Sequence, residues 1–206
     1  LNMTTNTVDV AAYATPAVRA RAALPPREKP YRFLPAGDVP PLAQFGGEAA
    51  VRFTGSTHDE RAIITKAPAK VAQLNEHLRA KIEDHLDEIE MVTYDAQAEA
   101  TTLFVSYGIT AGAMREAVAQ LRSDGRKVSA LTVHSLWPVP ERAIRDAVCA
   151  PGITRVVVAE LNHGQYRREI ERLAGNIEVR GLHRVDGELI APAQFIDSVR
   201  TSEVAK

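Results

Sequence analysis

The segment Glu160–Gln165, with the sequence ELNHGQ, holds the side chains best placed for chemistry. It lies between an apolar run and a helical pattern, where a parallel strand ends and a helix begins. Ligands of open α/β sheets bind outside the carboxyl ends of strands, and unpaired N–H groups at a helix start attract anions. Asn162 is equally a good N-cap, to which Gln165 can reach back as in a capping box. Glu160, Asn162, Gly164 and Gln165 are therefore candidates for a ligand or subunit contact, with capping as the alternative.

A second polar segment, Gly55–Glu60, has the sequence GSTHDE. Its three last side chains could ligate a metal, but adjacent residues point in different directions and no second cluster stands at ligand spacing. Ser56 could be a nucleophile, but the Gly-x-Ser-x-Gly elbow that exposes a catalytic serine is absent. We interpret the segment as a polar loop. Its candidate interface residues are Gly55, Thr57, His58, Asp59 and Glu60.

Two further features stand at or near predicted strand ends. The glycines of Tyr107–Gly112 allow a close backbone approach, so Gly108 is a candidate edge residue. The segment is not the Gly-x-Gly-x-x-Gly of dinucleotide sites, so nicotinamide binding is unsupported. Trp137 stands among apolar residues and prolines, which favours packing at an interface or core edge over stacking on a base.

Short β-branched strands alternate with helical patterns along residues 101–206. This alternation predicts an α/β fold, a three-layer sandwich with a mainly parallel sheet and helices on both faces. Pro140 and Pro192 each suit the first turn of a helix, and Asp186-Gly187 predicts a tight hairpin turn. The strands are expected at Thr102–Tyr107, Val128–Val133, Arg155–Glu160 and Ile177–Gly181.

The N-terminal part has a different composition. Residues 1–47 hold more than half of the 12 prolines, which predicts an extended arm or interdomain linker. Residues 48–100 are expected to be a connecting segment with one amphipathic helix over Pro68–Glu90, because its apolar residues recur at spacings of three and four. The chain begins with Leu1, so we expect a fragment or a processed chain.

The composition excludes several classes of function. Lys and Arg number 25 against 26 Asp and Glu, so no field of one sign favours nucleic acid or a membrane surface. The single Cys149 rules out a disulfide framework and a cluster held by four thiolates of this chain. The sequence shows no apolar run of membrane-span length and no secretory signal, so we expect a cytoplasmic protein.

Three stretches together resemble one family, in the same order and spacing: RFTGSTHDERAIIT, VSYGITAGAMREAVAQLRSDGRKVSALTVHSLWPVP and VVVAELNHGQYRREIERL. They are similar to the alpha subunit of 2-oxoglutarate or branched-chain 2-oxoacid:ferredoxin oxidoreductases, over about Asp38 to Ile196. The resemblance implies the transketolase C-terminal-like domain, which follows a thiamine-pyrimidine-binding domain in that family. The proline-rich arm resembles the interdomain segment. Ala62 departs from the family, which usually has Gly there.

The resemblance implies a complex that decarboxylates a 2-oxoacid on thiamine diphosphate, reduces ferredoxin and releases an acyl-coenzyme A. Thiamine diphosphate, magnesium, an iron–sulfur cluster and coenzyme A are expected in the whole complex and none on this chain. The implied partners are a beta subunit, gamma or delta subunits, and ferredoxin through the complex. This chain is expected to have a structural and subunit-interface role, with no catalytic residue and no activity in isolation.

Two alternatives share the fold. One is a stand-alone binding or scaffold module that has lost its enzyme. The other is the C-terminal domain of a 2-oxoacid dehydrogenase beta subunit, against which the two polar segments argue. Neighbouring genes for beta and gamma oxidoreductase subunits would favour the oxidoreductase.

Overall fold

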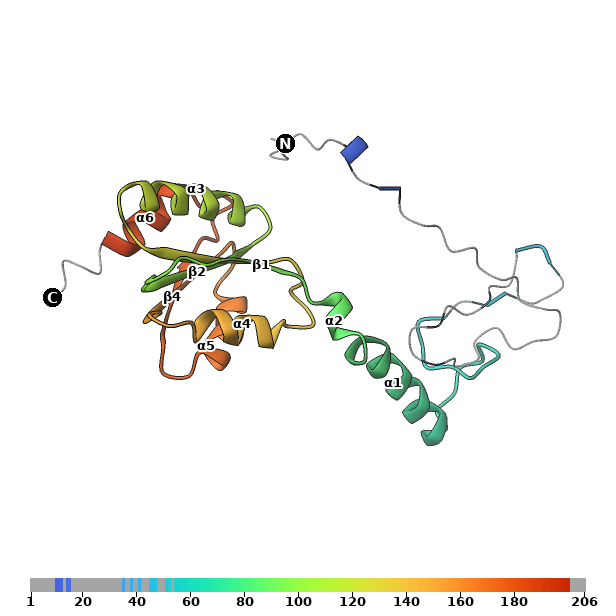
Figure 1. Cartoon of the computed structure of the whole chain (residues 1–206). Coiled ribbons are helices and arrows are strands. Elements are labelled where there is room, and N and C mark those ends of the chain that lie inside the picture. Colours follow the sequence, from blue (N-terminus) through green and yellow to red (C-terminus); the bar gives the residue numbers. More distant parts are fainter. Residues whose placement is uncertain are drawn as a thin grey trace. The chain divides into compact units, whose positions relative to one another are not determined.

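The computed structural model describes residues 54–200 without a gap, and upstream of them residues 10–12, 14–15, 35, 38, 41, 45–47 and 51–52 (Figure 1). Most of the expected proline-rich arm, residues 1–47, therefore lies outside the described residues. The chain divides into two compact units, Leu1–Asp87 and Glu88–Lys206.

The predicted amphipathic helix is shorter than expected. A 3₁₀ turn, η1 (Val10–Ala12), precedes α1 (Pro68–Glu83), and the short α2 (Leu86–Ile89) follows it. Between α1 and α2 the N–H of His85 bonds to the carbonyl of Ile82 at 3.1 Å, a three-residue spacing that tightens and ends the turn. None of the helices in the described part of the chain is long and apolar enough to cross a bilayer.

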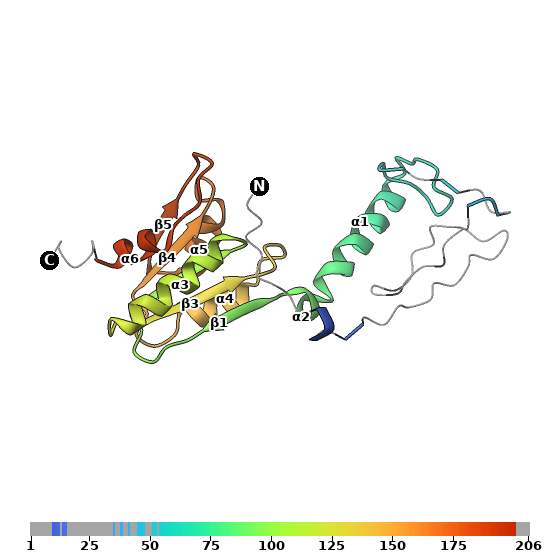
Figure 2. The same ribbon diagram turned by 90° about the horizontal axis from the view of Figure 1, so that it is seen from above.

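The second unit contains a five-stranded sheet in the order β1-β3-β2-β4-β5. Figure 2 looks onto the sheet from the side of α3 and shows β1 and β5 at its two edges. The neighbours among β2 to β5 are parallel, as expected, and only β1 is antiparallel. The strands are β1 (Val92–Asp95), β2 (Thr102–Tyr107), β3 (Val128–Val133), β4 (Arg155–Glu160) and β5 (Glu178–His183).

Strand β1 was not expected, because it lies inside the stretch 48–100 interpreted as a connecting segment. It pairs with β3, with Val92 opposite Val133. Only Val92 is half-buried and the other three residues of β1 are exposed, so the strand lacks the apolar alternation that marks a buried face. The Arg122 side chain holds its end by two bonds of 2.9 Å to the carboxylate of Asp95.

Four helices cover the two faces of the sheet, which confirms the predicted three-layer sandwich. Figure 1 shows α3 (Thr110–Ser123) and α6 (Pro192–Arg200) on one face, and α4 (Glu141–Val148) and α5 (Gln165–Ala174) on the other. Successive side chains of β2 point to opposite faces, as the two-residue period of a strand requires. Leu103 and Val105 pack in the core under α4 and α5, whereas Phe104 packs under α3 and α6.

The expected hairpin at Asp186-Gly187 is a bend that leads from β5 into α6, and no second strand follows it within residues 54–200. The Asp186 carboxylate accepts the N–H of Glu188 at 3.1 Å and the Arg184 Nε–H at 2.7 Å. Asp186 and Gly187 therefore form the bend. The hairpin prediction was wrong because a turn signal does not show whether the residues after the turn pair with the preceding strand.

Candidate functional site

The candidate residues of the second unit gather at the carboxyl edge of the sheet. Tyr107, Glu160 and His183 are the last residues of β2, β4 and β5, which are neighbours in the sheet. Gly108 follows β2, and the segment 161–164 joins β4 to the start of α5. Of the predicted positions, the structure therefore brings Glu160, Asn162, Gly164 and Gln165 together, with Gly108 after the neighbouring strand.

Glu160 is a buried carboxylate, with only 1% of the residue exposed. Its two oxygens accept the backbone N–H groups of Tyr166 at 2.9 Å and Arg167 at 3.0 Å. The Tyr107 hydroxyl donates a third bond at 3.1 Å. A helix N-terminus stabilises negative charge because its N–H groups and its dipole both point at the anion. In this protein the anion at the start of α5 is therefore the chain's own carboxylate.

Asn162 pairs the other two free donors of α5. Its Oδ1 accepts the N–H of Gly164 at 2.8 Å and of Gln165 at 2.9 Å, and its Nδ2 donates to the Tyr107 hydroxyl at 2.9 Å. A helix leaves its first four N–H groups without intrahelical partners. All four are paired here by Asn162 and Glu160, so the expectation of unpaired N–H groups was wrong.

The capping arrangement also differs from the predicted capping box. The N-cap position is Gly164, with a left-handed backbone at φ 86°, and Asn162 stands two residues before it. The Gln165 side chain is exposed and does not reach back to Asn162. Gln165 is thus the first helical residue, and the side chains of Asn162 and Glu160 together cap the helix.

The ring of His183 lies against two glycines. A Cβ built on Gly181 would stand 2.2 Å from the His183 Cε1 atom, and one built on Gly164 would stand 2.6 Å from it. Real Cβ atoms do not approach other atoms so closely. The ring therefore occupies the space that the Cβ of any residue other than glycine would need at positions 164 and 181. The His183 Nε2 atom lies 3.6 Å from a Glu160 oxygen, near enough for an ion pair and too far for a hydrogen bond.

Two tyrosines complete the network. The rings of Tyr107 and Tyr166 pack edge to face with centroids 5.6 Å apart. Burial, and then the neighbouring Glu160 carboxylate, raise the pKa of the Tyr107 hydroxyl to about 12. Burial is also the main cause that raises the pKa of the Tyr166 hydroxyl. Both rings are therefore held in the neutral form at ordinary pH.

We expect the Tyr107→Phe variant to lose less stability than the wild type as the solution becomes alkaline. The folded-state pKa of Tyr107 lies above its ordinary value of 10.0, so the unfolded chain ionises first. The stabilisation from neutral Tyr107 is present below pH 10.0 and is lost as the pH rises to about 12. Urea unfolding at several pH values measures this, with Tyr94→Phe on the exposed strand β1 as control. The same alkaline loss in Tyr107→Phe as in the wild type would contradict the expectation.

The polar segment Gly55–Glu60 belongs to the other unit, Leu1–Asp87, and forms a closed turn. The Asp59 carboxylate accepts the N–H groups of Arg61 at 2.9 Å and Ile63 at 3.0 Å. The Ile63 N–H bond is the main cause that lowers the pKa of Asp59. Glu60 forms an ion pair with Lys70 of α1. These contacts give Asp59 and Glu60 structural roles in the turn.

The remaining candidates of that segment are arranged around the same turn. His58 forms an isolated antiparallel bridge with Ile64, and the Thr57 carbonyl accepts the Thr65 N–H at 3.0 Å. Gly55 is exposed at its start. Among the described residues no group of three His, Cys, Asp or Glu side chains could hold a metal ion.

Replacement of Ala62 by Gly should leave the free energy of unfolding unchanged or raise it by up to about 1.6 kcal/mol. Ala62 has a φ of 61° in the same turn, where an L side chain costs about 1–2 kcal/mol. Gly also gives the unfolded chain more conformational freedom than Ala does. This entropy favours unfolding and offsets about 0.4–1 kcal/mol of the relieved strain. Ala72→Gly is the control, because Ala72 is exposed inside α1, where the backbone is helical and glycine costs about 1 kcal/mol relative to alanine. Urea unfolding compares the two, and a larger loss at position 62 would contradict the expectation.

Three members of the site were not among the candidate residues predicted from the sequence: Tyr107, Tyr166 and His183. Tyr107 stands directly before the candidate Gly108 at the end of a correctly predicted strand. His183 was missed because the predicted strand ended at Gly181, and β5 continues to His183. A strand end next to a candidate loop was the available signal for Tyr107, whereas no candidate loop marked His183.

Comparisons with known proteins agree with one another. Residues 100–195 match the family described as pyruvate:ferredoxin oxidoreductase core domain II. The chain is 31% identical over 188 residues to 2-oxoglutarate synthase subunit KorA of Methanothermobacter thermautotrophicus, which covers 88% of this chain and 50% of that protein. It is 31% identical over 121 residues to ketoisovalerate oxidoreductase subunit VorB of the same organism, covering 59% of this chain and 33% of that protein.

A solved structure has the same fold. It is 2-oxoglutarate:ferredoxin oxidoreductase from Magnetococcus marinus with 2-oxoglutarate, coenzyme A and succinyl-CoA bound. The TM-score is 0.74 at 22% identity, and the match covers 90% of this chain and 32% of that chain. At this identity the likeness shows the fold alone. The chain spans about half the length of the curated relatives it matches.

Proposed function

We propose that this chain, whose residues 100–195 match the pyruvate:ferredoxin oxidoreductase core domain II family, works as part of the alpha subunit of a thiamine-diphosphate-dependent 2-oxoacid:ferredoxin oxidoreductase. The observation that carries the proposal is the similarity to 2-oxoglutarate synthase subunit KorA over 88% of the chain. The reaction of the whole assembly is the oxidative decarboxylation of a 2-oxoacid to an acyl-coenzyme A, with reduction of ferredoxin. Its partners are a beta subunit, gamma or delta subunits, and ferredoxin.

Two features of this chain argue against its holding the iron–sulfur cluster or the diphosphate. The sequence contains one cysteine, whereas an iron–sulfur cluster ordinarily requires four thiolates. The N–H groups at the start of α5, which could otherwise receive a diphosphate, are occupied by Glu160 and Asn162. We therefore assign thiamine diphosphate, magnesium, the cluster and coenzyme A to other parts of the assembly.

The role that remains for this chain is architectural. Its carboxyl edge is fixed by a buried polar network, which holds the loops after β2 and β4 together. Such an edge suits a brace for a cofactor domain or a subunit interface. A single thiol fits a reducing compartment, so the proposal places the assembly in the cytoplasm.

The activity is tested by an assay of coenzyme A-dependent dye reduction with several 2-oxoacids. The assembly purified with its native subunits should reduce the dye, whereas the isolated chain and the assembly that lacks this chain should not. Activity that is undiminished without the chain would contradict the proposal and favour a stand-alone binding module.

The isolated chain should bind no thiamine diphosphate in the presence of magnesium. The physical reason is that the donors at the start of α5 are satisfied internally, so a diphosphate would have to displace a buried carboxylate. Titration calorimetry measures this, with the purified assembly as the positive control. Micromolar binding to the chain alone would show that a diphosphate site exists on it.

A further inference from the structure

The buried carboxylate of Glu160 is held by hydrogen bonds and has no lysine or arginine side chain paired with it in the described part of the chain. A buried charge is normally paired with an opposite charge, because hydrogen bonds alone replace only part of its lost hydration. The one basic side chain in ion-pair contact with it, among residues 54–200, is His183. We call these two residues the His183–Glu160 pair. The positive charge beside this carboxylate therefore depends on the pH.

The facing atoms of the pair are incompletely bonded. Within the described residues, Oε1 of Glu160 accepts one hydrogen bond, from the Arg167 N–H, whereas Oε2 accepts two. A carboxylate oxygen has two lone pairs, so Oε1 can accept another bond. The Nε2 atom of His183 is buried and makes no hydrogen bond. Its distance of 3.6 Å from Oε1 exceeds the ordinary limit of about 3.2 Å for such a bond, so a small movement of the ring closes the gap.

The sheet and two glycines hold the imidazole ring in this position. Glu160 and His183 stand opposite each other in the last register position of β4 and β5, and the Arg184 N–H bonds to the Glu160 carbonyl at 3.2 Å. The ring occupies the space that a Cβ would need at Gly164 and Gly181. Since Nε2 is buried there, the acceptor in front of it is the Glu160 carboxylate and not water.

Helix α5 brings a second cation close to the ring, and its charge is offset. The Arg167 Nε atom lies 3.4 Å from the point that a Cβ on Gly164 would occupy, next to the His183 ring. The same Nε atom forms an ion pair with Glu171 at 3.4 Å, so the two side chains together have no net charge. The unbalanced charge that His183 faces is therefore the negative charge of Glu160.

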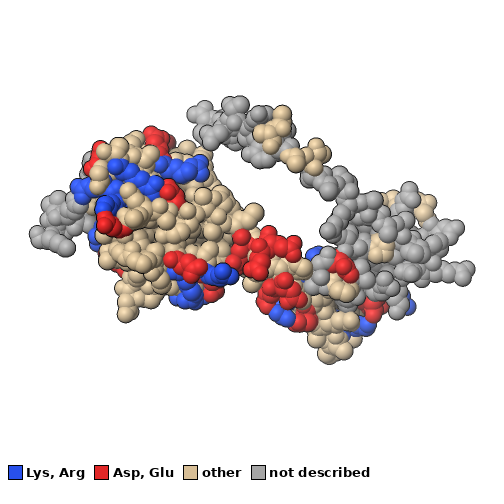
Figure 3. Space-filling view, in the orientation of Figure 1, with Lys and Arg blue, Asp and Glu red and all other residues tan. Residues whose placement is uncertain are grey.

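The other basic residues of this edge are paired at the surface. Arg180 forms an ion pair with Glu178 at 2.6 Å, and Arg184 forms one with Asp186 at 2.7 Å. Figure 3 shows basic and acidic side chains intermixed over the face of this unit that it draws. Solvent screens such exposed pairs, whereas a buried carboxylate is screened much less. The field of Glu160 therefore acts on His183 more strongly than these surface charges do.

We propose that the His183–Glu160 pair is a pH-sensitive switch that fastens the end of the edge strand β5. When His183 is protonated, its Nε2–H bonds to Oε1 of Glu160 as a charged pair and ties the end of β5 to β4 and to the start of α5. When His183 is neutral, the attraction between full charges is lost and the backbone bond from Arg184 remains. The switch is a property of the chain itself and does not depend on the proposed function.

Acidification should stabilise the folded chain through this pair. The folded state offers the protonated ring a buried carboxylate that the unfolded chain lacks, so the folded state binds that proton more tightly. The stabilisation is present on the acid side of the histidine range, at about pH 5.5, and is lost as the pH rises to about 8. Ordinary carboxyl groups remain ionised at about pH 5.5, so the comparison changes the imidazole and not its partner.

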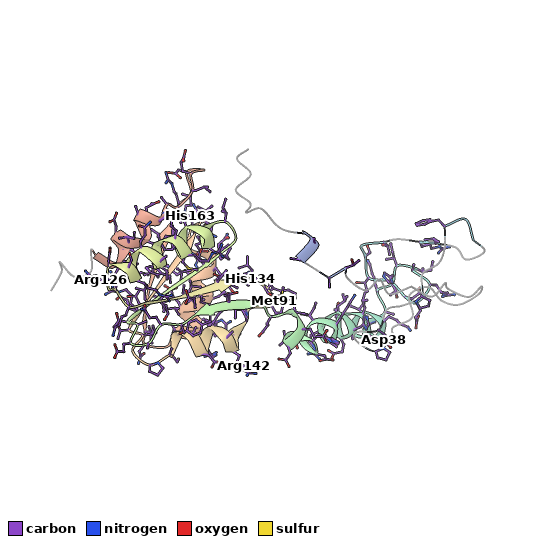
Figure 4. The ribbon with its side chains drawn as sticks, turned by 45° about the horizontal axis from the view of Figure 1, so that its top comes forward. Asp38, Met91, Arg126, His134, Arg142 and His163 are labelled. Carbon is purple, nitrogen blue, oxygen red and sulfur yellow. The ribbon has the colours of Figure 1, made fainter. Side chains whose placement is uncertain are left out.

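Urea unfolding of the full chain at these two pH values tests the switch. His183→Gln keeps an Nε2–H donor that does not titrate. The unfolding constant of the wild type, divided by that of this variant, should fall about 10-fold from the higher to the lower pH, which corresponds to a proton bound about one pH unit more tightly. His163, labelled in Figure 4, is exposed in the loop that leads to α5. With His163→Gln as control the ratio should change less than about 2-fold. Equal changes for both variants would overturn the proposal.

Two further measurements identify the partner. In a Glu160→Gln background, His183→Gln should no longer change the pH dependence of unfolding, and a persistent 10-fold change would show that another group holds the proton. Because Glu160→Gln is itself destabilising, NMR of the wild type gives a result that needs no variant. The ring signals of His183 should reach the imidazolium form at a higher pH than those of His163. The same or a lower pH would rule out the switch.

Discussion

The Glu160→Ala variant should lose about 2–5 kcal/mol of unfolding free energy. Removal of the carboxylate leaves the N–H groups of Tyr166 and Arg167 without an acceptor at the start of α5. Each buried donor left unpaired costs about 1–3 kcal/mol. The Tyr107 hydroxyl also loses its acceptor, so the hydrogen bond that joins the end of β2 to the end of β4 is lost.

Two further variants isolate the cause of that loss. Glu160→Gln keeps the shape but offers only one carbonyl oxygen to two N–H donors, so it should lose about 1–3 kcal/mol. Glu178→Ala, on the exposed strand β5, removes a carboxylate paired with Arg155 and Arg180 at the surface. Its cost should stay below about 1 kcal/mol, because solvent screens exposed ion pairs. Urea unfolding with circular dichroism measures all three, and equal losses in Glu160→Ala and Glu178→Ala would refute the role assigned to the buried carboxylate.

The Gly164→Ala variant should lose about 2–4 kcal/mol. A left-handed backbone costs an L side chain about 1–2 kcal/mol, and φ is 86° at this position. The new Cβ would also stand 2.6 Å from the His183 ring, which must move away from Glu160. Displacement of a packed group by one extra carbon costs about 1–3 kcal/mol.

Gly125→Ala is the matched control, because Gly125 has a φ of 77° at the end of α3 and nothing within 4 Å of an added Cβ. It should show the backbone strain without the clash. In a His183→Ala background, Gly164→Ala should cost no more than Gly125→Ala does, since the obstructing ring is gone. If the cost of Gly164→Ala is the same with and without the ring, His183 does not occupy the space that the structure gives it.

The periodicity of the sequence was sufficient to predict the bounds of the buried strands. Strands β2, β3 and β4 have the predicted bounds, because each is a short run of apolar and β-branched residues buried on both faces. Strand β1 escaped prediction because three of its four residues face solvent at the edge of the sheet. The start of α5 was predicted two residues too early, because Asn162 is a local signal of a helix start but the N-cap is Gly164.

The residues that Asn162 and Gly164 contact could not be predicted from the sequence. Asn162 announces a helix start in any context, but the Tyr107 hydroxyl that it binds stands 55 positions earlier in the chain. His183 meets Gly164 only because β4 and β5 lie side by side in the sheet. The same residues would suit an open anion site if the Glu160 side chain pointed away. Local propensity and burial period therefore determined where strands and helices run. The packing of distant strand ends, which no local pattern encodes, decided that the donors of α5 bind the chain's own carboxylate.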